Sequence, residues 1–198
     1  MIICDVKSGS SAPWHKLQVA AYALAWKEGD AGAITFDAET HTYHAGDEEI
    51  PGVSAILRDT GRQSSFAGMN PFYAQKGTYV HRAIELDCDG KLDETTVDEE
   101  VLPYLTAWRK FRADTDFEVA ATEQIVFHPV HRYCGRFDLL LAARNKEVNG
   151  AAILYLKKTG KYSWKRLSPT ELAEATAAWI QTVREYCWVN ELADDLWK

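Results

Sequence analysis

The chain has 198 residues, of which 46% are hydrophobic and 26% are charged, and its formal net charge is −7. This composition predicts one compact domain over residues 1–198, or at most two small ones, and excludes disorder or a coiled coil as the main architecture. No apolar run approaches the ~20 residues that a membrane helix needs, and we see no secretory signal, so we expect no membrane partner. The acidic balance argues against coating nucleic acid by bulk charge, but it does not exclude a nuclease, whose carboxylates gather around a divalent metal.

The cysteines lie far apart in the sequence, and no two of them form a C-x-x-C pair. They are Cys4, Cys88, Cys134 and Cys187. This spacing favours neither a zinc ribbon nor a disulfide framework. We therefore expect free thiols and a cytoplasmic protein.

Hydrophobic periodicity predicts strands and helices that alternate along the chain. In chain order we predict a strand at 1–7, a helix at 14–27, a hairpin within 33–50, a short helix at 54–57 that Ser54 caps, a loop at 60–70, helices at 71–88 and 98–114, strands at 117–127, 136–142 and 151–156, and a last helix from 169. These elements predict an α/β fold with a central mixed sheet flanked by helices.

The last helix has the clearest start. Ser168, followed three residues later by Glu171, forms a capping box, and Pro169 occupies the first helical position. Behind this start, one predicted helix face is apolar and consists of Leu172, Ala175, Trp179, Val183 and Tyr186.

Asp5 and Lys7 share one face of the first predicted strand. A carboxylate there can hold a hard cation, and the lysine can orient the attacking water or offset charge in the transition state of phosphodiester hydrolysis. The alternative is a surface salt bridge. Asp138 stands at the head of a hydrophobic strand, where a carboxylate needs a partner.

Three further residues are candidates for the same site. His81 lies on a predicted helix, with Glu85 one turn later. Glu85 either supports the site or pairs with Arg82 or Lys91. Glu123, near the start of a predicted strand, either supports the site or forms a surface pair.

A basic strip follows the last predicted strand. It consists of Lys157, Lys158, Lys161, Lys165 and Arg166, with Tyr162 and Trp164 interleaved. Such a strip either follows a phosphate backbone and stacks a base, or is a solvated strand face.

Together these residues resemble the RecB-like, phage exonuclease-like branch of the PD-(D/E)XK nuclease superfamily, and the resemblance spans most of the chain. In that family a Gly-x-x-x-His helix supplies a metal ligand, Gly-x-x-Asp supplies the first acid, Asp/Glu-x-Lys before Ser/Thr-Gly completes the site, and Gln-x-x-x-Tyr contacts DNA or supports the site. The matching residues are Gly77 and His81, Gly135 and Asp138, Asp5 and Lys7 before Ser8-Gly9, and Gln18 and Tyr22. Residues 36–43 and 50–54 also resemble phage exonuclease sequences.

The order of the motifs departs from the family. There the histidine helix and the Asp strand come first, whereas here the Asp-x-Lys strand and the Gln-x-x-x-Tyr helix do. We infer that residues 1–30 have moved to the amino terminus from between Glu147 and Ala151. Residues 33–149 would then hold the hairpin, the histidine helix and the Asp strands, and residues 151–198 the final strand and helix. Alternatively, strand 1–7 docks into a neighbouring chain of a domain-swapped homo-oligomer.

The resemblance implies a restriction-endonuclease-like core and a Mg²⁺- or Mn²⁺-dependent deoxyribonuclease, in the manner of an exonuclease that processes DNA ends. It implies that Asp138, Asp5 and His81 ligate the metal, and that Lys7 acts with the two aspartates in catalysis.

The resemblance also assigns supporting or DNA-orienting roles to Gln18, Tyr22, Glu85 and Glu123. Some relatives carry an iron–sulfur cluster on cysteines near the carboxy terminus, where this chain has Cys187 alone, so we expect no cluster. The alternative function is a catalytically inactive nuclease-fold module that binds DNA or another partner.

Overall fold

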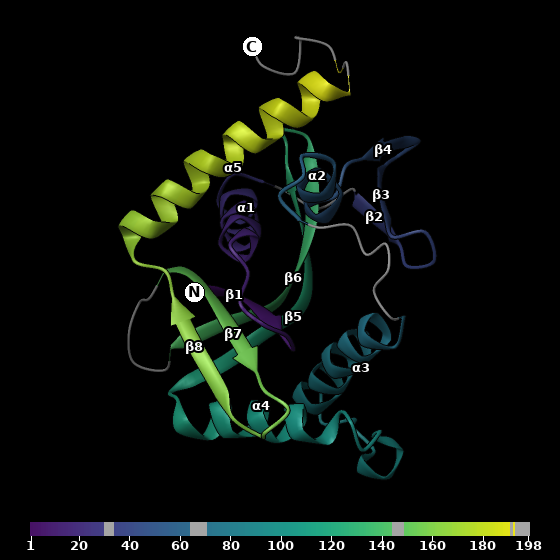
Figure 1. The fold of residues 1–198 in the computed structure, drawn as a ribbon, viewed down its shortest axis with the longest axis vertical. Helices are drawn as coiled ribbons and strands as arrows, with labels where there is room; N and C mark the ends of the chain where they lie inside the picture. The colour runs from purple at the N-terminus through teal and green to yellow at the C-terminus, as the bar shows by residue number, and fades with distance from the viewer. Residues whose placement is uncertain (30–33, 64–70, 144–148, 191, 193–198) are drawn as a thin grey trace. The chain divides into compact units, whose positions relative to one another are not determined.

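The computed structural model describes residues 1–29, 34–63, 71–143, 149–190 and 192 (Figure 1). The elements are β1 (Ile2–Lys7), α1 (Trp14–Glu28), β2 (Ile34–Asp37), β3 (Thr42–Ala45), β4 (Glu48–Ile50), α2 (Val53–Asp59), α3 (Pro71–Cys88), η1 (Glu94–Thr96), α4 (Leu102–Asp114), β5 (Phe117–His128), β6 (Tyr133–Ala143), β7 (Gly150–Leu156), β8 (Tyr162–Arg166) and α5 (Pro169–Val189). One mixed sheet has the strand order β5-β6-β1-β7-β8, and a second sheet has the order β2-β3-β4. The prediction of an α/β fold with a central mixed sheet flanked by helices is confirmed.

The chain divides into two compact units, which are described separately here. The first unit contains residues 1–12, 66–124 and 138–167, and the second contains residues 13–65, 125–137 and 168–198. The single nuclease domain over residues 1–198 stays a prediction.

In the first unit, β1 lies between β6 and β7. It pairs antiparallel with β6 through residues 2–4, and parallel with β7 along its whole length, up to Lys7 opposite Tyr155. The first strand thus lies directly beside β6, which carries Asp138. This position between β6 and β7 is where the inferred relocation of residues 1–30 puts the strand, and the pairing is within one chain. Oligomeric state stays a prediction.

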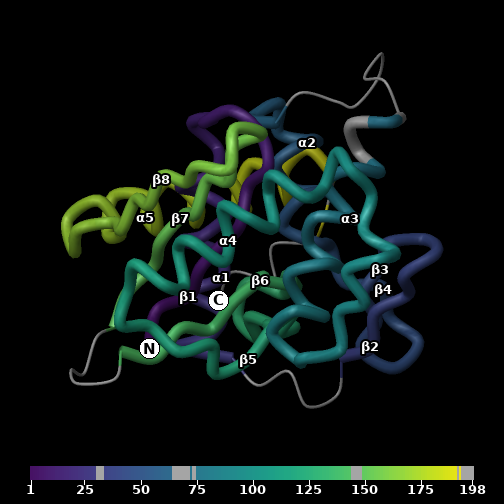
Figure 2. Tube along the Cα trace, turned by 90° about the horizontal axis from the view of Figure 1, so that it is seen from below, coloured from purple at the N-terminus to yellow at the C-terminus, as the bar shows by residue number. Residues whose placement is uncertain are grey.

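One face of the first unit's sheet is covered by α3 and α4. Alternate residues of β1 (Ile2, Cys4 and Val6) are buried on this face, together with Trp108 and Phe111 of α4. Figure 2 shows α4 lying across β7 and β8, with which it is in contact. Because each fully buried large apolar side chain contributes roughly 1.5–3 kcal/mol, this face holds the sheet and the two helices together.

Tyr162 and Trp164 of β8 belong to this same core. The Tyr162 ring meets Phe111 edge to face at 5.4 Å, and the Trp164 ring lies 5.1 Å from Phe111 and 5.8 Å from Phe117. The two aromatic side chains therefore pack inward and do not form a surface on which bases stack.

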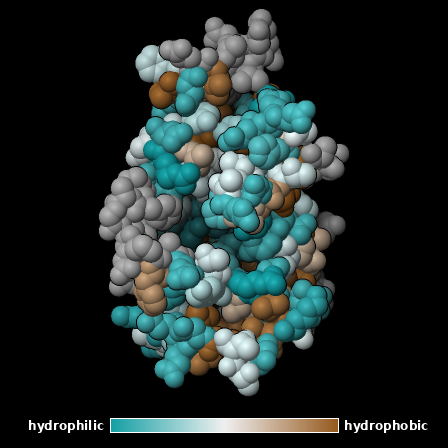
Figure 3. Space-filling model, turned by 90° about the vertical axis from the view of Figure 1, so that its right-hand side faces the viewer, coloured by the Kyte–Doolittle hydropathy of each residue, from teal (hydrophilic) through white to brown (hydrophobic). Residues whose placement is uncertain are grey.

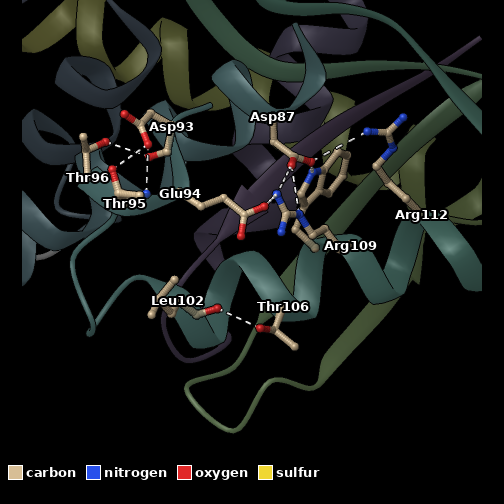
Figure 4. A network of polar contacts seen from close by, with 10 residues as sticks. Asp87, Asp93, Glu94, Thr95, Thr96, Leu102, Thr106, Arg109 and Arg112 are labelled. Atoms are coloured by element: carbon tan, nitrogen blue, oxygen red, sulfur yellow. Dashed lines mark hydrogen bonds and ion pairs between the residues drawn. The ribbon is translucent and has the colours of Figure 1, made fainter. Parts of the chain in front are cut away.

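Asp87 at the end of α3 joins three elements of the first unit (Figure 4). Its carboxylate accepts hydrogen bonds from Trp108 Nε1 at 2.9 Å and from Nε and Nη2 of Arg109 at 2.9 and 2.7 Å. Arg112 lies 3.7 Å from the same carboxylate, and Arg109 also pairs with Glu94 of η1 at 2.9 Å. We call these five residues the Asp87 cluster.

The second unit contains α1, α2, α5 and the antiparallel β2-β3-β4 sheet. The capping box at the start of α5 is confirmed, since Ser168 Oγ accepts from Glu171 N–H and Glu171 Oε2 accepts from Ser168 N–H. On the predicted apolar face Ala175, Trp179 and Val183 are buried, and Leu172 and Tyr186 are partly buried.

Two predicted helix starts are wrong. Gly52, not Ser54, caps α2, because residues 51 and 52 stay extended where Pro51 accepts a hydrogen bond from Cys134 N–H. The helix predicted from residue 98 begins at Leu102, because Asp98 forms a turn in which its carboxylate accepts from the Glu100 amide. Part of the predicted loop, residues 64–70, lies outside the described residues.

Within the described ranges, no helix combines the length and the apolar character needed to cross a membrane. On the face drawn in Figure 3, hydrophilic side chains predominate and hydrophobic ones gather in small groups.

Candidate metal centre

The candidate site lies in the first unit, where β1 and β6 part. The backbone pairing of the two strands extends to Cys4 opposite Leu139. After this pair the Val6 amide donates a hydrogen bond to the side chain of Asp138, at Oδ2. The Asp138 carboxylate thus takes the position of a backbone acceptor. This bond fixes the side chain against β1.

His81 reaches the same carboxylate from α3. Its Nδ1 lies 2.9 Å from Asp138 Oδ1. One helical turn earlier, Gly77 lies beside the chain that follows β1, where an added Cβ would be in ordinary contact with Ser8 Oγ at 3.8 Å. The predicted Gly-x-x-x-His segment therefore faces both Asp138 and the end of β1.

The two groups perturb each other's ionisation. Burial opposes the charge of each group, but the negative Asp138 and its hydrogen bond raise the pKa of His81. Burial raises the pKa of Asp138, but His81, Lys7 and the Val6 amide together outweigh it and lower the pKa to about 2. Asp138 is therefore an ionised carboxylate at neutral pH, which is the form that binds a metal.

Glu123 of β5 completes the group. Ligand atoms of His81, Glu123 and Asp138 all lie within 4.8 Å of one another. The Glu123 backbone is left-handed, with φ of 50°, a conformation that costs of order 1–3 kcal/mol for a non-glycine residue and that clusters at functional sites. The sequence marks Glu123 only through the family resemblance, as a supporting residue and not as a metal ligand.

This donor set fits a divalent cation. Imidazole nitrogen and carboxylate oxygen bind such ions at about 2.0–2.3 Å, so two ligands of one ion are separated by at most about 4.6 Å. The observed separation of up to 4.8 Å needs little adjustment. One nitrogen and two oxygen donors suit Mn²⁺, and also Mg²⁺ with water as the remaining ligand.

Asp5 and Lys7 lie beside this group. Asp5 is 2% exposed, and its Oδ2 lies 2.8 Å from Lys7 Nζ. Burial, together with the negative Asp138, raises the pKa of Asp5 to about 7 although Lys7 opposes the shift. Asp5 is not one of the three grouped ligands, so its predicted role as a metal ligand stays a prediction.

Glu85 pairs with Arg82, and its supporting role at the site stays a prediction. Its Oε2 accepts from Arg82 Nη1 at 2.6 Å. It also lines the small hollow at the site, whose residues are Val6, His81, Ile84, Glu85, Thr122, Glu123, Asp138 and Leu139.

Gln18 and Tyr22 belong to the second unit. Gln18 Nε2 donates to the Tyr22 hydroxyl at 2.8 Å. The Tyr22 ring covers Gly135, where an added Cβ would lie 2.4 Å from Cε1 of the ring. The glycine of the Gly-x-x-Asp segment is thus required by Tyr22, while the predicted action of Gln18 and Tyr22 on DNA stays a prediction.

No protein-family model matches this chain, and no curated protein matches it. The function is therefore inferred from the residues and the chemistry of the site itself.

Proposed function

We propose that the protein is a metal-dependent nuclease that hydrolyses phosphodiester bonds in DNA. The observation that carries this proposal is the convergence of His81, Glu123 and Asp138 next to Lys7. Two carboxylates and an imidazole form a site for a divalent cation, and an adjacent ammonium group is the complement of a phosphate.

Each residue has a distinct task in this proposal. His81, Glu123 and Asp138 would hold Mg²⁺ or Mn²⁺, which when bound polarises the phosphoryl group and lowers the pKa of water. The Val6 amide keeps Asp138 oriented. Lys7, which Asp5 holds at 2.8 Å, would orient the attacking water or offset the charge that develops on the phosphoryl oxygens.

The proposal includes membership of the RecB-like branch of the PD-(D/E)XK nucleases, with the segment order rearranged. It is supported by the strand order β6-β1-β7, which sets the Asp138 strand directly beside the Asp5-x-Lys7 strand. The proposed activity is that of an exonuclease acting on DNA ends. The proposed location is the cytoplasm, where the four free cysteines would remain reduced.

The test is cleavage of linear and circular DNA with Mg²⁺ or Mn²⁺, against EDTA, by the parent and by single-site variants. Asp138→Asn, Glu123→Gln and Lys7→Ala should each lower the rate by about a hundredfold or more, because metal ligands and their neighbours are worth at least this much. An exonuclease would degrade the linear substrate and spare the circle.

The matched control is Glu118→Gln, which makes the same change as Glu123→Gln on an exposed position of the same strand and should retain the parent rate. A folded parent that cleaves no DNA with either metal would overturn the proposal and favour the inactive binding module. An equal loss of activity in Glu118→Gln would mean that the activity does not depend on the carboxylate of Glu123 in particular, and would contradict the assignment of the site. Binding of Mn²⁺, followed by electron paramagnetic resonance, should weaken in His81→Ala.

A further inference from the structure

A second charged feature of the first unit lies at the turn between β7 and β8. Lys157, Lys158 and Lys161 are all exposed there. Within the described part of the chain, none of the three forms an ion pair with an acidic side chain. In a chain of net charge −7, this concentration of unneutralised cations marks a local site for an anionic partner.

The turn is held in one conformation. Lys157 N–H donates to Lys161 O at 2.9 Å, and Gly160 N–H donates to Lys157 O at 3.0 Å. Gly160 has a φ of 70°, and a Cβ there would lie 3.5 Å from Thr106 Cγ2 of α4. Because two backbone hydrogen bonds close the turn, the three lysines present their charges together without a large loss of backbone entropy on binding.

The register of β1 and β7 relates this turn to the metal centre. Lys7 is opposite Tyr155 in the parallel pair, and Lys157 follows two residues later at the same edge of the sheet. With strands about 4.8 Å apart and a rise of about 3.3 Å per residue, the Cα atoms of Lys157 and Lys7 are about 8 Å apart. Ser11 Oγ lies 3.2 Å from the Tyr155 hydroxyl, so the chain after β1 continues along the end of β7.

The turn presents positive charge but no aromatic surface on which bases could stack. The neighbouring Tyr162 and Trp164 side chains pack on Phe111 in the core, so they are not available to bases. Contacts from lysines alone reach phosphates and carry no sequence information.

We propose that Lys157, Lys158 and Lys161 bind backbone phosphates of the DNA strand whose scissile phosphate lies at the Asp138 site. This inference rests on the proposed nuclease function, and it assigns the turn to substrate binding beyond the scissile bond. It predicts that the turn matters for long substrates and not for small phosphodiesters.

The experiment compares two double variants. K158Q/K161Q removes two charges of the turn, and K91Q/K110Q removes two charges from exposed lysines elsewhere in the same unit. Substrates are bis(p-nitrophenyl) phosphate and a single-stranded oligonucleotide of about 16 nucleotides, the upper site size of one single-strand-binding module. Binding of the same oligonucleotide in EDTA is followed by fluorescence anisotropy at several salt concentrations.

We expect K158Q/K161Q to raise KM and Kd for the oligonucleotide severalfold and to leave hydrolysis of the small ester unchanged. The slope of log K against log salt should become shallower by about 1.4, since each single-strand phosphate contact contributes about 0.7. K91Q/K110Q should retain the parent slope. An unchanged slope in the turn variant, or an equal change in the control, would overturn the inference.

Failure of the nuclease proposal has a different signature. A parent that hydrolyses neither substrate would refute the proposed chemistry, whereas the anisotropy measurement in EDTA still tests the turn, because it needs neither metal nor turnover.

Discussion

Asp87 and Asp138 are two aspartates of the first unit with equal burial and different surroundings. Their side chains are 11% and 12% exposed. Asp87 is met by the Trp108 indole and by two arginines, all of which donate to it or pair with it. Asp138 is met by one imidazole and one backbone amide.

The balance of charge separates the two clusters. The Asp87 cluster pairs two acids with two arginines, so its charges are compensated within the protein. Around Asp138, the carboxylates of Asp5 and Glu123 lie close by, and His81 and Lys7 face three acids. A satisfied network stabilises the fold, whereas an uncompensated one attracts a cation. The two aspartates are equally buried, so it is the number of donors and the balance of charge around each carboxylate that separate them.

The largest effect on stability should come from Asp87. Asp87→Asn should lower the free energy of unfolding by about 2–3 kcal/mol, because hydrogen bonds to a charged group are lost. In EDTA, Asp138→Asn should cost less than about 1 kcal/mol, since it also removes repulsion from neighbouring carboxylates. Urea denaturation measures both values. Equal losses in the two variants would contradict the distinction between the clusters.

A steric test extends the comparison to the second unit, where Tyr22 and Gly135 meet through packing and not through charge. Gly135→Ala should destabilise by about 1–2 kcal/mol, because the new Cβ overlaps the Tyr22 ring and overpacking costs this much. The same substitution in a Tyr22→Leu background should cost less, because the ring is gone. Thermal unfolding of the parent, the two single variants and the double variant gives the coupling energy between positions 22 and 135. Additive losses of stability would rule out the contact as the cause.

The smallest expected effect on stability comes from the ionisation of His128 and His131 in the second unit. Asp138 raises the pKa of His81, but burial lowers the pKa of His128 and His131 below the ordinary 6.5, helped at His131 by His128 and Arg184 and opposed by Glu28. Near and below the unfolded histidine pKa, the unfolded chain therefore binds more protons than the folded protein. The stability that is present above this pKa is lost as the pH falls from it through the lower pKa values of the folded state.

The measurement is the free energy of unfolding between about pH 8 and pH 5, where histidine titrates. H128N/H131N should show a flatter decline towards acid than the parent. A steeper decline in the double variant would mean that the two imidazoles are stabilised in their charged form.

Local patterns predicted much of this fold. The short β-branched run in residues 1–7, the helical spacing in 14–27 and the capping box at Ser168 each depend on neighbours in the sequence, and each element formed as expected. The predicted start of α2 was wrong because a bridge from Gly52 to the distant Cys134 keeps the chain extended.

The candidate site was predicted in part for the same reason. Asp138 and His81 were identified from motifs and meet in the structure, at 2.9 Å. Glu123 joins them through a left-handed backbone that no sequence pattern announces, and the pairing of Asp5 with Lys7 followed from their shared strand face. The Asp87 cluster went unnoticed because Asp87 lies on α3 and its donors lie on α4, and only tertiary packing brings the two helices together.

The central position of β1 has a consequence for biosynthesis. Val6 and its partner Asp138 are 132 residues apart, and the parallel partner β7 lies further along still. A ribosome therefore releases the apolar β1 strand long before either neighbour exists, and such long-range pairing is slow to form. The Val6 amide and the Asp138 carboxylate can therefore meet only after residue 138 has been made.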